Sequence, residues 1–285
     1  MLDVVIIIPA HNEEKFIKKT LNSLLGQTYL PARIIVVDDH STDRTADIVQ
    51  ELAERHSIIN LINRRSKANS LPGAKVINAF YDGLATVEGH YDVICKFDAD
   101  LVFPVNYLRT LVDAFQQEVD LGMIGGVCTI YQNDTWKVEG LTNLDHIRGA
   151  IKAYRRPCFE QIGGLKRAMG WDTIDELLAR YHGWQVKVKK ELKVKHLKPT
   201  GKIYRRKLPL QFGVSVFKMR YGFFIGLLAI SKLAFRKKSL YFFILGCLGF
   251  LKASMLGESK LVTKDEGLFI RQYRMRNIKR RFLLT

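Results

Sequence analysis

Two aspartates one residue apart, Asp98 and Asp100, follow an apolar run in the stretch "DVICKFDADLVFP" (92–104). Carboxylates this close repel each other and lose hydration when they are partly buried, so a positive group must compensate them. Mg²⁺ and Mn²⁺ commonly bind through one or two carboxylates, with phosphate oxygens completing the shell. The pair therefore predicts a metal site. The alternative is that Asp98 caps the turn and Asp100 the next helix.

Two other polar clusters also follow apolar runs. "PAHNEE" (9–14) comes after "VVIII", and "DDHSTD" (38–43) comes after "RIIVV". In parallel α/β sheets, ligands bind beyond the carboxyl ends of the strands, so the three clusters are expected to face one crevice. A carboxylate at such an edge, here Asp38 or Asp39, accepts hydrogen bonds from a base N–H or a ribose hydroxyl. Capping of the following helix by Ser41 or Thr42 is compatible with that role.

The elements that must position these clusters alternate along the chain. β-branched runs predict buried strands, and apolar residues at helical spacing predict helices between them. Such alternation specifies a mostly parallel, doubly wound α/β sheet. The expected strands are 4–9, 33–39, 59–64, 91–100 and 121–131, and the expected helices are 12–27, 41–56, 73–87 and 106–117.

Composition limits the class and the compartment. The chain has 285 residues, 47% of them hydrophobic, and a net charge of +17 that is concentrated after Lys187. The four cysteines form no CxxC pair, which argues against a zinc site or a disulfide framework and favours a reducing compartment. The amino terminus lacks the basic region of a signal peptide, so a cytoplasmic location is expected.

The carboxyl-terminal region changes character. Two apolar segments, 221–235 and 239–257, are each interrupted by one lysine and are joined by Arg236, Lys237 and Lys238. The sequence predicts a catalytic domain over 1–205 and a basic, hydrophobic helical region over 206–285. A monotopic pair of helices on an anionic leaflet, at the cytoplasmic face of the cell membrane, is favoured over a crossing. A helical hairpin packed on the catalytic domain is the alternative.

Three motifs together resemble the inverting family 2 glycosyltransferases of GT-A fold, over roughly residues 3–200. They are "VVIIIPAHNEEKFIKKTLNSLLGQ", "RIIVVDDHSTDRTADIV" and "CKFDADLVFP", in that order. The resemblance implies a nucleotide-sugar donor, usually a UDP-sugar, an Mn²⁺ or Mg²⁺ ion, and inversion at the anomeric carbon. By analogy with envelope polysaccharide enzymes, it also implies a glycan or lipid-linked acceptor.

The resemblance also assigns roles to individual residues. Asp39 is expected to contact the uracil, Asp100 to ligate the metal, and Asp98 to touch the ribose or the metal. Lys75 and Arg64 or Arg65 are candidates for added positive charge near the phosphates. The residues expected to line the nucleotide-sugar pocket are Pro9, Ala10, Asn12, Glu13, Asp39, Lys75, Asp98 and Ala99.

An inverting transfer needs a base that takes the proton of the acceptor hydroxyl. The matching stretch is "IGGLKRAMGWDTIDELLARYHGW", where counting back from "HGW" without gaps places the base on Asp172. Trp171 stands where the family usually has an acid, and a short gap would make Asp175 the base. His196 lies where some GT-A enzymes supply a third metal ligand, and an exposed or structural histidine is the alternative.

Two other classes fit parts of the sequence. A nucleotidyltransferase should have a glycine-rich, basic loop after the first strand, whereas "PAHNEEKF" is acidic and has no glycine. A non-catalytic protein that binds nucleic acid or another anionic surface would explain the net charge, but here the bases cluster beside hydrophobic segments. We therefore expect an enzyme with no nucleic-acid partner.

Overall fold

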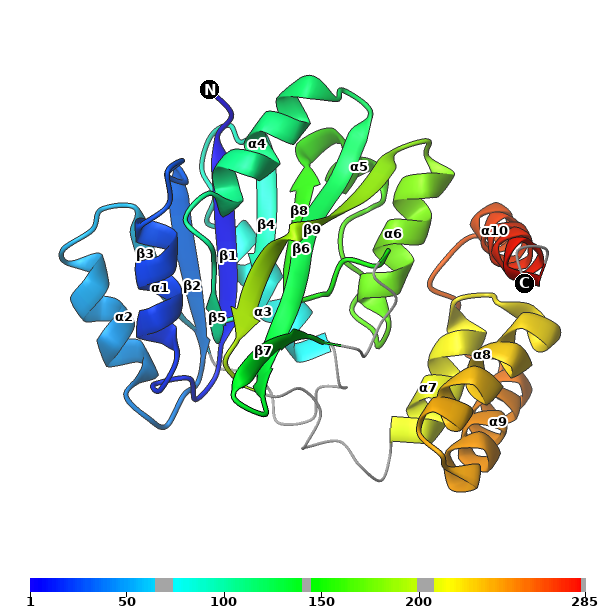
Figure 1. The fold of residues 1–285 in the computed structure, drawn as a ribbon. Helices are drawn as coiled ribbons and strands as arrows, with labels where there is room; N and C mark the ends of the chain where they lie inside the picture. The colour runs from blue at the N-terminus through cyan, green and yellow to red at the C-terminus, as the bar shows by residue number, and fades with distance from the viewer. Residues whose placement is uncertain (65–73, 140–144, 199–207, 283–285) are drawn as a thin grey trace. The chain divides into compact units, whose positions relative to one another are not determined.

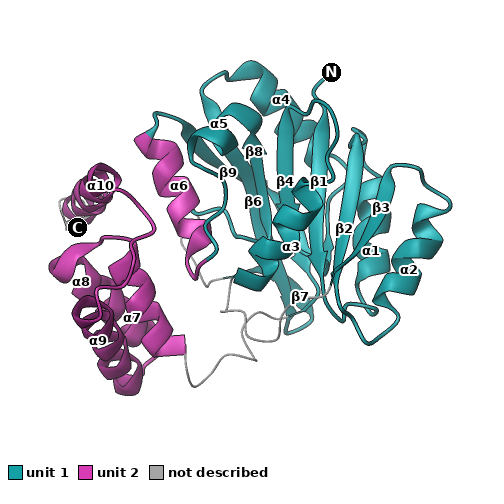
Figure 2. Cartoon of the chain, turned by 180° about the vertical axis from the view of Figure 1, so that it is seen from behind, with its two compact units in different colours: residues 1–167, 182–199 teal, residues 168–181, 200–285 magenta. Residues whose placement is uncertain are grey.

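The computed structural model describes residues 1–64, 74–139, 145–198 and 208–282 and contains two compact units. The first unit comprises residues 1–167 and 182–199, and the second comprises residues 168–181 and 200–285 (Figure 2). The expected domain boundary at residue 205 lies outside the described residues. The segment 168–181, expected in the catalytic domain, is grouped with the carboxyl-terminal helices.

One half of the sheet is parallel. Its strands are β1 (Val4–Ala10), β2 (Arg33–Asp39), β3 (Ile59–Arg64) and β4 (Val93–Phe97), in the order β3-β2-β1-β4 (Figure 1). All four match strands predicted from β-branched runs, which suit strands covered on both faces. Their carboxyl ends lie at one edge, so "PAHNEE", "DDHSTD" and "FDAD" begin there as predicted.

The other half of the sheet is mixed. It continues as β8 (Ile151–Arg155), β6 (Leu121–Gln132), β9 (Gln185–His196) and β5 (Leu101–Val102), and β7 (Thr135–Val138) pairs with β6. β8 runs antiparallel to both β4 and β6, whereas β9 is parallel to β6. β6 therefore runs in the same direction as β4, and β9 delivers His196 to the edge where Asp98 follows β4. Of these strands only β6 was predicted.

Helices cover both faces of the sheet. α1 (Ile17–Leu25), α2 (Thr45–Ala53) and α4 (Tyr107–Gln117) lie on one face, and α3 (Ala74–Leu84) and α5 (Arg156–Gln161) on the other (Figures 1 and 2). The Tyr107 ring lies 4.9 Å from Phe103 and 5.9 Å from Phe97, and Phe80 lies 5.9 Å from Phe159. The Tyr107 contacts join α4 to the end of β4, and the Phe80 contact joins α3 to α5, whose Phe159 lies 5.5 Å from Tyr154 of β8. With helices packed on both faces of the sheet, the α/β fold class is confirmed.

The second unit is helical. It contains α6 (Trp171–Tyr181), α7 (Leu208–Lys218), α8 (Gly222–Arg236), α9 (Leu240–Met255) and α10 (Lys264–Phe282) (Figure 2). The Tyr181 ring of α6 lies 5.5 Å from Phe269 of α10, which ties the two ends of this unit together. Within the described ranges, none of the helices combines the length and the apolarity that crossing a membrane would require.

Candidate active site

The loops after β1 and β2 are joined by hydrogen bonds. The Asn12 side-chain oxygen accepts from the Thr42 amide at 2.8 Å, and the Asn12 amide donates to the Ser41 hydroxyl at 2.9 Å. Asn12 has φ 56°, a left-handed conformation that asparagine tolerates better than most residues. Pro9 and Ala10 end β1 immediately before it. Asn12 therefore shapes the edge where the sequence predicted a nucleotide pocket.

The acidic pair that ends β2 has two different environments. Asp38 accepts hydrogen bonds from the amide and hydroxyl of Ser41, which fixes the turn after the strand. Asp39 lies 3.4 Å from the Arg64 guanidinium, which also pairs with Asp82 at 2.5 Å. Arg64 thus neutralises these two acids, rather than standing alone as a phosphate ligand. Asp39 is 8% exposed at the carboxyl edge of the sheet, and its contact with the base stays a prediction.

Asp98 and Asp100 are compensated by different cations. The Lys96 ammonium, only 2% exposed, pairs with Asp98 and donates to the Gly149 carbonyl at 3.1 Å. Lys96 precedes Asp98 by two residues on the strand, so both side chains point to the same face. Asp100 instead faces His196, whose Nε2 lies 3.3 Å from its Oδ2. The positive charge that the sequence required is therefore supplied in part by the protein itself.

A threonine of α1 fixes the turn that carries the two aspartates. The Thr20 hydroxyl, fully buried, donates to the Ala99 carbonyl at 2.7 Å and accepts from the Leu101 amide at 3.0 Å. These two bonds satisfy buried backbone groups on both sides of Asp100. The sequence analysis missed Thr20, although a hydroxyl among the apolar positions of a helix signals a buried partner.

His196 lies between two buried carboxylates. Its Nε2 faces Asp100, and its Nδ1 lies 3.7 Å from the Glu139 carboxylate, which pairs with Arg148 at 2.8 Å. Burial lowers the pKa of His196, but hydrogen bonding to Asp100 and Glu139, together with the charges of Asp100 and Asp98, outweighs this and raises it to about 9. Without a metal, His196 is therefore an imidazolium that neutralises Asp100. Glu139 and Arg148 were not among the predicted site residues.

The donor atoms fit a hard divalent ion. Two adjacent ligands of an octahedral ion with bonds of about 2.1 Å lie about 3 Å apart, and the Asp100 and His196 donors lie 3.3 Å apart. Glu139 stands at the other ring nitrogen, as a carboxylate commonly does behind a ligating histidine. The 3.3 Å spacing is compatible with the predicted roles of Asp100 and His196 as metal ligands, which stay predictions.

A second donor set shares the same histidine. Cys128, Glu139 and His196 are buried, with ligand atoms within 4.8 Å of one another, and form a candidate metal cluster among the described residues. Burial raises the pKa of the Cys128 thiol to about 12. Because only the thiolate is a strong ligand, ion binding there would require a costly deprotonation. The pair of Asp100 and His196, which needs no thiolate, is the better match for Mg²⁺ or Mn²⁺.

Glu13 connects the first loop to the end of β9. Its carboxylate accepts from the Lys198 ammonium at 2.7 Å. Burial raises the pKa of Glu13 above its ordinary value, and Lys198 opposes that shift. Lys75 is exposed in the first turn of α3, which starts at the sheet edge where β3 ends. Glu13 is therefore already partnered, whereas Lys75 is accessible to solvent.

The two candidate bases lie on α6, in the second unit. Asp172 is half-buried in the first turn of the helix. Asp175 is 1% exposed, and its carboxylate accepts from the Glu176 amide at 2.7 Å. A base must reach the hydroxyl of an incoming acceptor, so accessibility favours Asp172.

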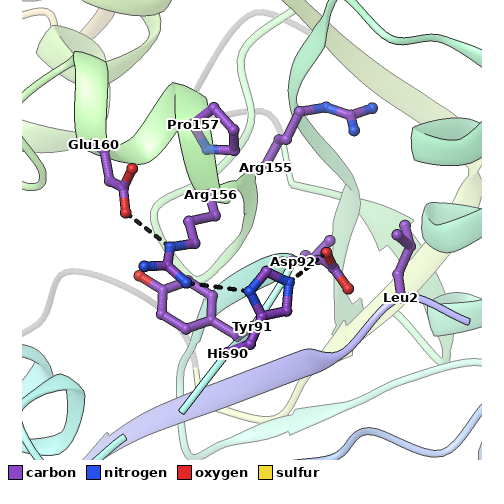
Figure 3. Close-up of a pocket in the computed structure, with 9 residues that line it drawn as sticks. Leu2, His90, Tyr91, Asp92, Arg155, Arg156, Pro157 and Glu160 are labelled. Atoms are coloured by element: carbon purple, nitrogen blue, oxygen red, sulfur yellow. Dashed lines mark hydrogen bonds and ion pairs between the residues drawn. The ribbon is translucent and has the colours of Figure 1, made fainter. Parts of the chain in front are cut away.

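A cavity of about 500 Å³ lies at the opposite edge of the sheet (Figure 3). Its charged side chains satisfy one another: Arg156 pairs with Glu160 at 2.8 Å, and His90 pairs with Asp92 at 2.9 Å. Arg155 donates to the backbone carbonyls of Phe115, Glu118 and Leu121. The cavity lies at the amino end of β4, away from Asp98 and Asp100, and none of the predicted site residues lines it.

Comparison with known proteins identifies the family. Residues 5–170 match the profile of glycosyl transferase family 2, and the chain belongs to that family. The resemblance inferred from the three motifs is therefore confirmed.

Individual relatives match shorter stretches. The probable glycosyltransferase YdaM of Bacillus subtilis is 37% identical over 99 residues, 34% of this chain and 22% of that protein. A dolichyl N-acetyl-α-D-glucosaminyl phosphate 3-β-D-2,3-diacetamido-2,3-dideoxy-β-D-glucuronosyltransferase of Methanococcus voltae is 30% identical over 128 residues, 43% of this chain and 38% of that protein. The matches thus span less than half of either relative.

The fold is that of GT-A glycosyltransferases. The crystal structure of GalNAc-T7 with UDP, GalNAc and Mn²⁺ aligns with a TM-score of 0.62 at 14% identity, covering 81% of this chain and 50% of that one. At this identity the similarity establishes the fold, and the GT-A architecture expected from the sequence is confirmed.

Proposed function

We propose that the protein is an inverting glycosyltransferase that moves a sugar from a nucleotide diphosphate donor, first of all a UDP-sugar, to a hydroxyl group. The observation that carries this proposal is the pairing of Asp100 with His196, beside Asp98, at the carboxyl edge of the sheet. Family membership and the UDP and Mn²⁺ of the GalNAc-T7 structure support the same donor chemistry.

Asp100 and His196 would hold an Mn²⁺ or Mg²⁺ ion, with Asp98 beside it. Such an ion acts as a Lewis acid that stabilises the diphosphate as it leaves. Lys96 neutralises Asp98, so that the edge does not repel a diphosphate as strongly as two free carboxylates would. Asp39 accepts a hydrogen bond from the base or ribose and orients the donor.

The acceptor hydroxyl loses its proton to Asp172 while its oxygen forms a bond to the anomeric carbon. The bond between that carbon and the diphosphate oxygen breaks, and its electron pair leaves with the nucleoside diphosphate. Attack on the face opposite the leaving group inverts the configuration. Asp172 serves this role because it is half-buried, whereas Asp175 is enclosed and bonded to its own helix.

The proposed acceptor is a lipid-linked sugar or a growing polysaccharide. Support comes from the relative in Methanococcus voltae, whose name describes transfer to a dolichyl-phosphate-linked sugar. The proposed location is the cytoplasmic face of the cell membrane, where such acceptors are assembled from cytoplasmic nucleotide-sugars.

Calorimetric titration of UDP into the purified protein, with and without Mn²⁺, tests the donor site. We expect Mn²⁺-dependent binding in the wild type and in Asp113→Asn, an exposed acid that pairs only weakly with Arg109 at 3.8 Å. Asp100→Asn should lose the Mn²⁺ dependence, because one anionic ligand is removed. Metal-independent binding that is unchanged in Asp100→Asn would show that the two aspartates are structural and would overturn the mechanism.

Product analysis separates the proposal from its nearest rival. A glycosyltransferase releases nucleoside diphosphate from a nucleotide-sugar, whereas a nucleotidyltransferase releases pyrophosphate from a nucleoside triphosphate and a sugar phosphate. Release of UDP that depends on an added lipid-linked or glycan acceptor, and that Asp172→Asn abolishes, supports transfer with Asp172 as the base. Release of pyrophosphate would replace the proposed activity.

A further inference from the structure

α9 exposes a continuous apolar stripe. Exposed residues recur every three or four positions along the helix, so they share one face. None of them is charged, and each is between 48% and 87% exposed: Tyr241, Ile244, Leu248, Leu251 and Met255. A stripe of large apolar side chains along a whole helix marks an interaction surface rather than scattered surface residues.

The opposite face of α9 is already used. Its buried residues include Gly246 and Gly249, which pack on α7 at backbone distance. A Cβ atom on Gly249 would lie 2.1 Å from the Leu210 carbonyl oxygen, and one on Gly213 would lie 1.9 Å from that of Gly246. α9 is therefore held in the helical unit by its glycine face, and the five exposed apolar side chains named above lie on its other face.

α8 carries a second exposed apolar stripe. α8 and α9 pack on each other within the helical unit (Figure 2). Phe224, Leu228 and Phe235 are 60%, 38% and 86% exposed and follow one another at helical spacing. We define the docking face as these three residues of α8 together with Tyr241, Ile244, Leu248, Leu251 and Met255 of α9.

The charged side chains of α8, α9 and the turn between them all have one sign. From Gly222 to Gly257 the chain has no Asp or Glu and has five bases: Lys232, Arg236, Lys237, Lys238 and Lys252. Three of them are consecutive and exposed in the turn between α8 and α9. A large apolar face on two helices that carry only cations matches the surface of an anionic bilayer, where apolar side chains enter the acyl boundary and bases meet lipid phosphates.

We propose that the docking face binds the helical unit to the surface of an anionic lipid bilayer, with α8 and α9 lying in the interface. This inference is independent of the proposed catalytic activity, because it uses no residue of the donor site. A second copy of the chain would also cover the apolar stripes, but a copy carrying the same five bases would bring like charges together. The uniform positive charge therefore favours lipid over self-association.

Vesicle co-sedimentation of the full chain tests the proposal. We expect binding to vesicles of phosphatidylcholine and phosphatidylglycerol in equal parts, and much weaker binding to phosphatidylcholine alone. The double variant Ile244→Asn, Leu248→Asn should lose most of this binding. Its matched control is Leu268→Asn on α10, because Leu268 is 49% exposed, as are both Ile244 and Leu248, and lies outside the docking face.

The cationic turn is tested separately. Each base near an anionic surface contributes about 1 kcal/mol, so replacing Arg236, Lys237 and Lys238 by Gln should lower partitioning on the order of a hundredfold. Replacing three exposed bases of the first unit, Arg55, Lys190 and Lys193, by Gln removes the same charge and should change partitioning little. If both triple variants lost partitioning equally, net charge alone would explain the loss, and the specific role of the turn would be overturned.

Three results would overturn the proposal as a whole. One is wild-type protein that stays in the supernatant with the mixed vesicles. Another is a double variant that sediments as well as the wild type. The third is a wild-type dimer, measured by light scattering without lipid, that the double variant converts to monomer, because a second copy would then cover the face. Mn²⁺-dependent UDP binding should be unchanged in the double variant, so failure here leaves the donor site untouched.

Discussion

Thr20 shows how one hydroxyl supports the site. Its two hydrogen bonds hold the Ala99 carbonyl and the Leu101 amide on either side of Asp100. Thr20→Val keeps the shape but leaves both backbone groups buried without a partner, which should lower the free energy of unfolding by about 2 kcal/mol or more. Chemical denaturation measures this loss, and Mn²⁺-dependent UDP binding should weaken with it. Thr20→Ser keeps the hydroxyl and should retain most of the stability and most of the UDP binding. Equal losses in Thr20→Val and Thr20→Ser would contradict the role of the hydroxyl.

Glu139 is expected to act through His196. It faces Nδ1 of the histidine while Arg148 fixes its carboxylate, an arrangement that orients the ring toward Asp100. Removing such a carboxylate typically weakens metal binding by about 10- to 100-fold. We expect Glu139→Gln to reduce the affinity for Mn²⁺ by about the same factor. Calorimetry of Mn²⁺ in the presence of UDP gives the measurement. Glu118→Gln, which disrupts a pair with Lys187 outside the site, is the control and should not change the affinity.

Asp43 stabilises the start of α2 in a pH-dependent way. Burial alone would raise its pKa, but hydrogen bonds from Thr45 and Glu14 outweigh this and hold the pKa below its usual value. The stabilisation is therefore present above about pH 4 and is lost as the pH falls through the lowered value. Asp43→Ala should cost about 1 kcal/mol at neutral pH, as for a lost helix cap.

The destabilisation caused by Asp43→Ala should disappear as the pH becomes acidic. Denaturation of wild type and Asp43→Ala at pH 7 and at a series of values below pH 4 should give curves that differ at pH 7 and move together as the pH falls. Glu51→Ala, which removes an exposed ion pair with Arg44 on the same helix, should have little effect at any of these pH values. A difference for Asp43→Ala that persists unchanged at acidic pH would contradict the role of its ionised carboxylate.

At the scale of elements, the packing of β9 against β6 positions His196, the predicted metal ligand. β9 ends at His196, and β6 approaches it so closely that a Cβ atom on Gly126 would lie 2.2 Å from the Leu192 carbonyl oxygen. Gly126→Ala should therefore destabilise the protein by about 3 kcal/mol, at the upper end for overpacking, and displace β9. Thermal denaturation and Mn²⁺-dependent UDP binding report the two effects.

Gly26 provides the comparison for this substitution. It ends α1 with φ −85°, and a Cβ atom there would lie 3.4 Å from the Asn22 carbonyl oxygen, an ordinary contact. Gly26→Ala should change stability by no more than about 0.5 kcal/mol. If Gly126→Ala were tolerated equally well, the close approach of β6 and β9 would not be needed to position His196.

Elements with a strong apolar pattern were predicted, and elements with mixed patterns were not. β1, β2 and β4 are covered on both faces, so their β-branched runs identify them without tertiary information. β9 reads "QVKVKKELKVKH", where Val186, Val188, Leu192 and Val194 alternate with lysines over part of the strand. That alternation is typical of a half-exposed strand, but the segment was interpreted only as a basic stretch.

The candidate site, like the fold, could be predicted only in part from the sequence. Asp98, Asp100 and His196 have side chains whose chemistry is evident from type and position, and the fold brings them to one edge. Lys96 and Glu139 act by contacting those residues, and Thr20 acts by bonding the backbone on either side of Asp100. Thr20 and Glu139 are distant from their partners in the sequence. Such contacts arise from strand order and register, which the sequence pattern does not specify.

At the scale of the whole molecule, the two units should respond differently to ligand. UDP with Mn²⁺, each far above its dissociation constant, stabilises only the unit that binds them, by about 2.7 kcal/mol at a hundredfold excess. We expect the unfolding transition of the first unit to rise by about 5 °C or more in calorimetry. In Asp100→Asn the ligands should produce no such rise. Equal shifts in the wild type and in the variant would show that binding does not use this site.

The cysteines divide between the two units in a way that gives each unit its own reporter. Cys95, Cys128 and Cys158 are buried in the first unit, while Cys247 is partly exposed on α9 in the second. Burial raises the pKa of both Cys95 and Cys128, so a thiol reagent can reach them as reactive thiolates only when the first unit opens. The labelling rates of Cys95 and Cys128 therefore measure how often the first unit opens, whereas the rate for the partly exposed Cys247 reports how accessible α9 is in the folded second unit.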